Sequence, residues 1–356
     1  RMMIASLFAA ALGATAPTLD PVDVRWTFGA HEPMPMYRRM GCRSTGAIDG
    51  NARWTRDWLD WFDAHAPEKM EELGFNFIHS RFYKGMGWEV EKKDFPNVKK
   101  FVANCHAHGV KALGYVQFAT LYYEVMEKEI PDLESWAAVN DRGEKYMYHT
   151  QYNRWIPCIN NEAWRKYMER ILTIALTEGG FDGVMFDNCF AYACYCPRCQ
   201  KAFREHIQSL PDCAERFGFS SMPGVRIPVP YHWEGCIAPP PGDVRDPLLQ
   251  EWYRWRARTL TEVVRRFYRH IKSVKPDAIV SANAHPFRAS ANAERLSLEM
   301  IRAEQPQAKL IVSALLPRGG KDDPLREKAR AWNVEIERLA LKRGVQCVNF
   351  WNRFID

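Results

Sequence analysis

The sequence predicts an α/β protein built as a (β/α)8-type (TIM) barrel, either complete or lacking its last strands, with a C-terminal α/β segment. Three observations lead to this fold class. Short apolar runs alternate with amphipathic helical segments along most of the 356 residues, which is the pattern of a parallel sheet. Polar residues follow the predicted strand ends, where barrels build their sites. No Gly-rich phosphate loop or dinucleotide motif follows any strand, which disfavours a nucleotide-binding doubly wound sheet.

Each element has a local signal. The first predicted strand, 74–82, begins at a Gly after a helical pattern, and the next helix, 95–109, ends at Gly109. A Pro- and Gly-rich stretch at 211–247 has the length of a functional loop or an insertion. The remaining predicted strands are 110–118, 153–159, 181–187 and 277–287, and the remaining helices start near Asn161, near Pro197 and at 248.

Composition narrows the classes of partner. The chain is 47% hydrophobic and 26% charged, as in ordinary globular proteins, so a large core is expected. The net charge of +6 comes from Lys and Arg spread along the chain without a basic run, and we therefore expect neither a nucleic-acid nor a membrane partner. Aromatic residues make up 13%, which suits a carbohydrate-binding cleft and a large core equally.

The N-terminus has the parts of a secretory signal peptide over residues 1–20. A basic start precedes an apolar run from Met2 to Leu12 that is too short to span a bilayer, and small residues follow. Pro17 disfavours cleavage directly before it. The sequence thus predicts a secreted or periplasmic protein, with a barrel over 21–290 and a separate segment over 291–356.

The polar residues after the strands define a candidate site. Asp187 ends the apolar run "FDGVMFD" and is the expected catalytic carboxylate, with Asn188 beside it. Because the carboxyl ends of parallel strands share one edge, we expect a single cleft there. A cation such as Arg81 would keep the Asp187 carboxylate ionised. The predicted substrate-binding residues are His79, Arg81, Tyr115, Gln117, Asn188 and His285.

Three cysteines lie within the six residues that start at Cys194, in the spacing C-x-C-x-x-C. This spacing lets Cys194, Cys196 and Cys199 reach one tetrahedral ion, and four thiolates without an open position form a structural zinc site. Cys158, at the end of the predicted strand 153–159, is the best fourth ligand because it would lie beside the fourth strand; Cys189 is a second option. Buried or paired cysteines are the alternative, and a thioredoxin-like redox pair lacks its context.

The segment "CYCPRCQKAFREHI" resembles the cysteine region of glycoside hydrolase family 42, the zinc-containing β-galactosidases. The resemblance spans about 35–290 and implies that Cys158, in "WIPCINNEAWRKY", completes the zinc ligands Cys194, Cys196 and Cys199. "FDGVMFDN" departs from that family, whose strand-4 Glu acts as general acid. It is more similar to amylase- or fucosidase-like barrels and hypothetical glycosyl hydrolases, in which a strand-4 Asp is the nucleophile, and this implies that role for Asp187.

The tail, 294–356, resembles the later part of an SGNH (GDSL-type) hydrolase, on the landmarks "QPQAKLIVSALLPRG" and "GVQCVNFWNRFID". That family's catalytic members have no counterpart here, so the resemblance implies a βαβ unit without catalysis. Alternatively, 309–315 and 345–350 are strands six and seven of the barrel. A truncated or chimeric sequence would explain the start at Arg1 and the end at Asp356.

The function expected from these residues is hydrolysis of a glycosidic bond in an oligo- or polysaccharide, with structural Zn²⁺. Such chemistry needs two carboxyl groups, and the partner of Asp187 is open: Asp141, Glu144 and Glu234 are loop candidates. Without a second carboxyl group the chain would be a non-catalytic or inactivated carbohydrate-binding barrel. An SGNH esterase is disfavoured because no GDS-type segment occurs. In either barrel Trp88, Trp136 and Trp155 could stack on sugars, although core packing is the commoner fate of Trp.

Overall fold

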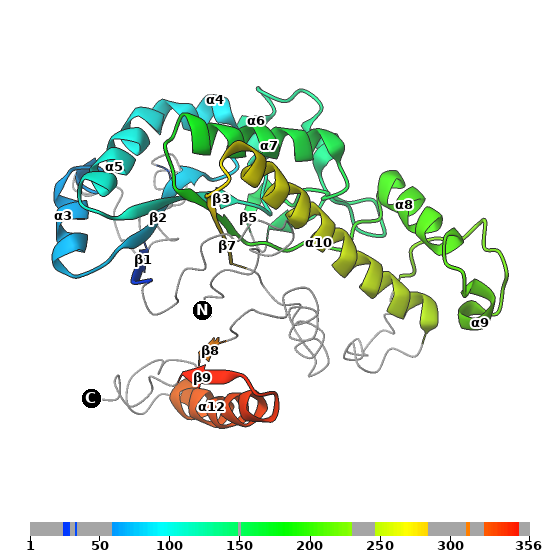
Figure 1. Ribbon diagram of the computed structural model, residues 1–356. Coiled ribbons are helices and arrows are strands. Elements are labelled where there is room, and N and C mark those ends of the chain that lie inside the picture. The colour runs from blue at the N-terminus through cyan, green and yellow to red at the C-terminus, as the bar shows by residue number, and fades with distance from the viewer. Residues whose placement is uncertain are drawn as a thin grey trace. The chain divides into compact units, whose positions relative to one another are not determined.

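The computed structural model describes residues 24–28, 33, 59–148, 151–229, 246–283, 311–313 and 324–348. The chain divides into two compact units. The larger spans Phe8–Arg295 and contains a five-stranded sheet, and the smaller combines Arg1–Leu7 with Leu296–Asp356 and contains a two-stranded sheet (Figure 1). The predicted signal peptide at 1–20 lies outside the described residues.

A curled parallel sheet forms the centre of the larger unit (Figure 1). Its strands lie side by side in chain order, without reversal, and each neighbouring pair is parallel. A doubly wound sheet reverses its order at a switch point, whereas a barrel adds each strand to the same side. The α/β class is therefore confirmed, as a half-barrel of five described strands. They are β1 (Trp26–Phe28), β2 (Phe77–Tyr83), β3 (Lys111–Gln117), β6 (Gly183–Asp187) and β7 (Ile279–Ala282).

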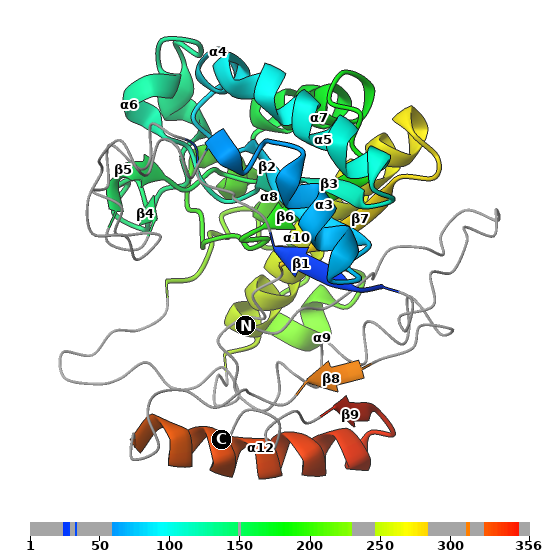
Figure 2. The ribbon, with the colours of Figure 1, turned by 90° about the vertical axis from the view of Figure 1, so that its left-hand side faces the viewer.

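Crossover helices cover one face of this sheet. Figure 1 shows α5 and α7 along the sheet, and Figure 2 shows α3 beside α5. The main apolar cluster fills the layer between helices and strands, and it includes Ile78, Phe82, Val116, Val184 and Phe186 of the sheet. None of the described helices is both long and apolar enough to cross a membrane. The four crossover helices are α3 (His65–Glu72), α5 (Phe95–Ala107), α7 (Glu162–Thr177) and α10 (Pro247–Val274).

The helix starts follow from their capping residues. The Asn161 side chain accepts hydrogen bonds from the backbone N–H groups of Ala163 and Trp164, which satisfies two of the free donors at the start of α7. Asp246 caps α10 in the same way, and Pro247 occupies its first turn. The predicted starts near Asn161 and at 248 are thus confirmed to within one residue.

The opposite face of the sheet carries the polar residues. Side chains alternate along a strand, so partners in parallel register share a face. Arg81 pairs with Tyr115, and Gln117 pairs with Asp187, so all four project away from the main apolar cluster. This arrangement brings the polar ends of β2, β3 and β6 to one side of the sheet.

The predicted strand at 153–159 is wrong as a member of the central sheet. β5 (Gln151–Trp155) instead pairs with β4 (Met147–Tyr148) in an antiparallel hairpin that is inserted between β3 and β6. A short apolar run does not reveal which sheet it joins: residues 153–159 are all buried, as a central strand would be, although the chain forms a hairpin there. The sequence analysis also missed β1. Because one strand was wrongly included and another was missed, β6 is the fourth strand of the sheet, as predicted.

The shorter elements lie in the connections at the carboxyl ends of the strands. Two follow β2, two follow β3 before the hairpin, and two follow β6. They are α4 (Trp88–Glu91) and η2 (Lys92–Asp94), α6 (Tyr123–Met126) and η3 (Leu133–Trp136), and α8 (Pro197–Gln208) and α9 (Cys213–Phe217).

The smaller unit contains a strand–helix–strand arrangement. β8 (Ile311–Ser313) pairs in parallel with β9 (Gln346–Val348), and α12 (Pro324–Lys342) lies between them in the chain. The two strands form a sheet of their own rather than adding to the five-stranded sheet. The βαβ form agrees with the sequence analysis, whereas the SGNH resemblance stays a prediction.

Candidate functional site

Asp187 is the centre of the polar group at the carboxyl ends of the strands. Its half-buried carboxylate accepts hydrogen bonds on Oδ2 from the Tyr115 hydroxyl and from Asn188 Nδ2, the latter at 2.7 Å. Oδ1 accepts a hydrogen bond from Asn283 Nδ2 at 2.8 Å. These donors come from β3, from the residue after β6 and from the residue after β7. A carboxylate has about four acceptor sites, so one site on Oδ1 is left without a partner among the residues that the structure describes.

The chain turns sharply after Asp187, and backbone contacts fix that turn. Asn188 has a left-handed φ of 53°, a conformation that Asn tolerates better than most residues. Cys189 N donates to the Asn283 carbonyl at 3.1 Å, and Asn283 N donates to the Phe186 carbonyl at 2.7 Å. These bonds hold the ends of β6 and β7 together, which sets the position of the Asn283 amide against Asp187.

A buried lysine that the sequence analysis missed joins this network. Lys84 follows β2 directly, and its Nζ donates to the Tyr115 hydroxyl at 3.1 Å and lies 4.9 Å from the ring centre. The same hydroxyl lies 2.6 Å from Gln117 Oε1. A phenol has a single proton, so it serves either Gln117 or Asp187, and the charged acceptor Asp187 forms the stronger bond. Lys84 and Tyr115 thus form a chain of donors that ends on the carboxylate.

The other predicted cleft residues are placed less centrally. His79 is buried, and its Nδ1 accepts from Trp26 Nε1 at 2.8 Å. The ion pair of Arg81 is with Asp94, at 2.8 Å, rather than with Asp187. The cation in the Asp187 network is therefore Lys84, and His285 lies outside the described residues.

None of the candidate second carboxyl groups joins the Asp187 network in the described part of the chain. Asp141 and Glu144 are exposed on a turn, where Glu144 Oε2 accepts from Asn140 Nδ2 at 2.7 Å. Glu234 lies outside the described residues. The three tryptophans considered as sugar platforms, Trp88, Trp136 and Trp155, are all buried.

Glu91 holds the loop that carries Lys84. Its buried carboxylate accepts from the backbone N–H of Lys84 at 2.6 Å and of Met86 at 2.8 Å. Burial raises the pKa of Glu91 to about 7, against the opposing effects of Arg81 and of these N–H groups. The loop after β2 therefore depends on a carboxyl group that titrates near neutral pH.

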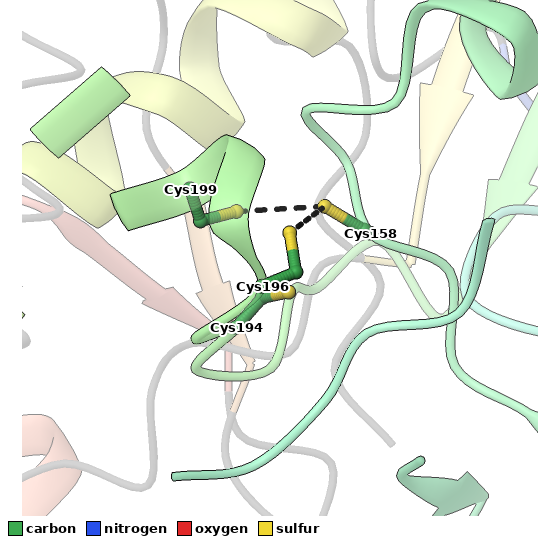
Figure 3. A group of neighbouring side chains, drawn as sticks. All are labelled: Cys158, Cys194, Cys196 and Cys199. Atoms are coloured by element: carbon green, nitrogen blue, oxygen red, sulfur yellow. Dashed lines mark hydrogen bonds between the residues drawn. The ribbon is translucent and has the colours of Figure 1, made fainter. Parts of the chain in front are cut away.

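Four cysteines form a second cluster, at the start of α8 (Figure 3). The sulfurs of Cys158, Cys194, Cys196 and Cys199 all lie within 4.8 Å of one another. Cys158 Sγ is 3.8 Å from Cys196 Sγ and 3.5 Å from Cys199 Sγ. Four sulfurs at about 2.3 Å from one tetrahedral ion are about 3.8 Å apart, whereas a disulfide needs about 2.05 Å. The cluster therefore fits a metal ion.

Local structure and charge favour a thiolate at Cys196, while hydrogen bonds to neighbouring thiols raise the pKa values of Cys194 and Cys199. Cys196 caps α8 and Cys199 lies in its first turn, where the helix dipole stabilises negative charge. Hydrogen bonds from neighbouring thiols, Cys158 first, lower the pKa of Cys196. Arg198 Nη1 lies 3.9 Å from Cys158 Sγ and 3.8 Å from Cys196 Sγ, which offsets the negative charge of four thiolates.

The structure decides between the two candidates for the fourth cysteine. Cys158 is in the cluster although it does not follow a strand of the central sheet; the turn before α7 places it there. Cys189 is outside the cluster, and burial raises the pKa of its thiol to about 12. In the described part of the chain, this is the one group of three or more potential metal ligands.

Comparison with known proteins gives a likeness of fold. No family model matches the chain, and no curated protein matches it. The catalytic domain of the β-amylase from Paenibacillus polymyxa is similar over 80% of both chains, with a TM-score of 0.50 and 10% identity. The α-L-fucosidase isoenzyme 2 from Paenibacillus thiaminolyticus (TM-score 0.47, 15% identity) matches over 81% of this chain and 36% of its own. The β-galactosidase from Bacillus circulans sp. alkalophilus (TM-score 0.48, 14% identity) matches over 80% of this chain and 48% of its own.

The chain thus spans about a third to a half of the first solved structures it matches. At these identities the likeness concerns the fold, and the similarity to the β-amylase domain supports a TIM-barrel-like arrangement. The neighbours named here are glycoside hydrolases with folds of that kind.

The raised pKa of Glu91 predicts a specific pH dependence of stability. The folded protein favours the protonated form of Glu91. Its contribution to the free energy of unfolding is therefore complete below pH 4.5, the ordinary pKa of a Glu side chain, and is lost as the pH rises through about 7. Replacing Glu91→Gln removes this dependence. We expect the free energy of unfolding of the wild type to fall relative to Glu91→Gln between pH 5 and 8, by on the order of 3 kcal/mol. Urea unfolding at a series of pH values measures the difference, and parallel profiles would contradict the account.

Proposed function

We propose that the protein is a glycoside hydrolase in which Asp187 is the catalytic carboxylate. The observation that carries this proposal is the convergence of Tyr115, Asn188 and Asn283 on Asp187 at the carboxyl end of the fourth strand. Barrel enzymes build their active sites at this end of the sheet. The similarity of fold to a β-amylase domain supports the same class of reaction.

The geometry suits a nucleophile or a general base. Oδ2 is held by two donors, so the carboxylate cannot rotate, and Oδ1 keeps one acceptor site toward a substrate. As a nucleophile, Oδ1 would form a bond to the anomeric carbon while the glycosidic C–O bond breaks and a second carboxyl group protonates the leaving oxygen; water would then hydrolyse the glycosyl ester and restore the carboxylate. Lys84 would hold the Tyr115 hydroxyl in place during this change.

A non-catalytic carbohydrate-binding barrel is the alternative. It is favoured by one observation: in the described residues, every group hydrogen-bonded to Asp187 is a hydroxyl or an amide, and none is a second carboxyl group. Turnover of any glycoside by the purified protein separates the two functions.

We also propose that the cysteine cluster holds one structural zinc ion. Four thiolates leave no open coordination position, which suits structural rather than catalytic zinc. Asn160 Nδ2 donates to Cys199 Sγ at 3.3 Å and Arg198 lies beside two sulfurs, so the ligands have the supporting contacts that metal sites need.

We also propose that a signal peptide at residues 1–20 directs export of the protein.

The zinc proposal predicts about one zinc per chain by elemental analysis of the purified protein. Cys194→Ser should lower the zinc content and the melting temperature together, because metal binding contributes directly to folding. Cys189→Ser is the matched control, since its buried thiol lies outside the cluster. A folded, metal-free wild type, or a Cys194→Ser variant with full zinc, would contradict the proposal.

The catalytic role of Asp187 predicts that Asp187→Asn removes nearly all turnover of aryl glycosides. Zinc content and melting behaviour should stay unchanged, because the amide keeps the size and most of the hydrogen bonds. Asp182→Asn is a matched control at the opposite end of the same strand. There the carboxylate accepts from Ala112 N at 2.8 Å and supports the fold. Retained turnover in Asp187→Asn would contradict the assignment, and so would an equal loss of turnover in a folded Asp182→Asn variant.

The donor chain predicts that Tyr115→Phe acts on the chemical step. Loss of one hydrogen bond to a charged acceptor should lower kcat about ten- to hundredfold with little change in KM. A residue that contacts only the substrate would raise KM instead. Tyr83→Phe is the control, because its hydroxyl meets Tyr167 rather than Asp187. Steady-state kinetics of the two variants distinguishes these outcomes.

A further inference from the structure

A buried arginine that has no counter-ion among the described residues lies in the β4–β5 hairpin. Arg154 is 4% exposed, and its guanidinium carbon lies over the rings of Tyr122, at 4.6 Å from the ring centre, and Tyr148, at 4.8 Å. Among the described residues it forms no ion pair and no hydrogen bond, and its Nε is buried without a partner. Two aromatic rings thus surround a full positive charge that no carboxylate balances there.

This situation contrasts with that of two other buried charges of the larger unit, Glu251 and Arg81. Glu251 is 1% exposed and is bound by His206 at 2.7 Å and by Arg216 and Arg258. Arg81 is paired with Asp94. A buried charge without a partner is costly, since burial removes its hydration and nothing replaces it. A protein retains such a group where a bound ligand supplies the missing charge.

Contacts on two sides place Arg154 near the end of the sheet that carries Asp187. Tyr122 N donates to the carbonyl of Gly85, the residue after Lys84, at 2.9 Å. Tyr148 stacks on Phe190, with ring centres 6.3 Å apart, and Phe190 N donates to the Asn188 carbonyl at 2.8 Å. Both tyrosines are therefore attached to the loops that follow β2 and β6, on either side of the candidate site.

We propose that Arg154 recognises an anionic substituent, a carboxylate or a sulfate, on the saccharide that the site accepts. The inference rests on the proposed function and names its substrate class. A guanidinium donates in its own plane, so rings over its face leave the edges for a ligand, and a carboxylate or sulfate fits such an edge with two hydrogen bonds. A neutral sugar would leave the charge unbalanced.

Binding to the Asp187→Asn variant tests this inference separately from catalysis. The probes are matched pairs: trigalacturonate and its methyl ester, a glucuronate-bearing xylo-oligosaccharide and its carboxyl-reduced form, and a sulfated galactan oligosaccharide and its desulfated form. We expect at least one acidic member to bind about tenfold or more tightly than its neutral partner by calorimetry. The first two pairs report a carboxylate and the third a sulfate.

Arg154→Met in the same background should abolish the acidic preference, and Arg154→Lys should keep part of it. Arg256→Gln is the matched control: Arg256 also lies over a ring, 4.8 Å from the centre of Trp252, but it donates to the Ala191 carbonyl at 3.1 Å. The preference of Arg256→Gln for acidic over neutral probes should equal that of the Asp187→Asn variant without a second substitution. Equal binding of both members of every pair, no binding of any acidic probe, or a preference that survives Arg154→Met would overturn the inference.

The melting temperature without ligand gives an independent check. Replacing an unbalanced buried charge with Met should leave the melting temperature equal or higher, whereas breaking an internal ion pair should lower it. A marked decrease in Arg154→Met would show a partner within the chain and overturn the inference. Acidic binding without turnover by the wild type would instead contradict the proposed hydrolase while supporting the role of Arg154.

Discussion

The candidate site depends on the parallel pairing of β6 with β3 on one side and β7 on the other. Because Gln117 pairs with Asp187 in register, Tyr115 and Asp187 lie on the same face of the sheet. The hydrogen bond from Asn283 N to the Phe186 carbonyl positions Asn283, whose side chain is the third donor to the Asp187 carboxylate. Gly183 is essential to this pairing, since a Cβ there would lie 1.9 Å from the Ile279 carbonyl oxygen. Any larger residue would push β7 away and displace Asn283 from the carboxylate.

Two further constraints position the loops around Asp187. The carboxylate of Glu91 holds the backbone of the loop from which Lys84 reaches Tyr115. The cysteine cluster joins the end of the loop after β6 to the turn before α7, across segments 38 residues apart at Cys158 and Cys196. The loop that begins at Asn188 is thus fixed at both ends, by the β7 contact and by the cysteines.

The sequence predicted the elements whose ends carry their own signals. Asn161 and Pro197 marked helix starts because capping and first-turn preferences are local. The position of Asp187 at a strand end was predicted because it ends an apolar run, and it is the last residue of β6. The run at 153–159 was misassigned because membership of a sheet depends on distant partners, and periodicity does not encode them.

The residues that were missed or misplaced lie where tertiary contacts decide. Lys84 is a lysine beyond a strand end, which is usually solvent-exposed, and only the fold buries it against Tyr115. Arg81 lies on the expected face but pairs with Asp94, which η2 brings within reach. Cys158 is the fourth cysteine of the cluster, as predicted. The reason given for it was wrong, because Cys158 does not follow a strand of the central sheet.

The central claim, that Asp187 is the reacting carboxylate, is tested most directly by covalent labelling. Sugar epoxides of several configurations, with and without a carboxylate, react with a glycosidase nucleophile to form a stable ester. The experiment uses purified protein that turns over aryl glycosides. After the protein is labelled and digested, mass spectrometry should find the ester on the peptide that contains Asp187. Labelling of a different carboxyl group, with Asp187 unmodified, would contradict the account.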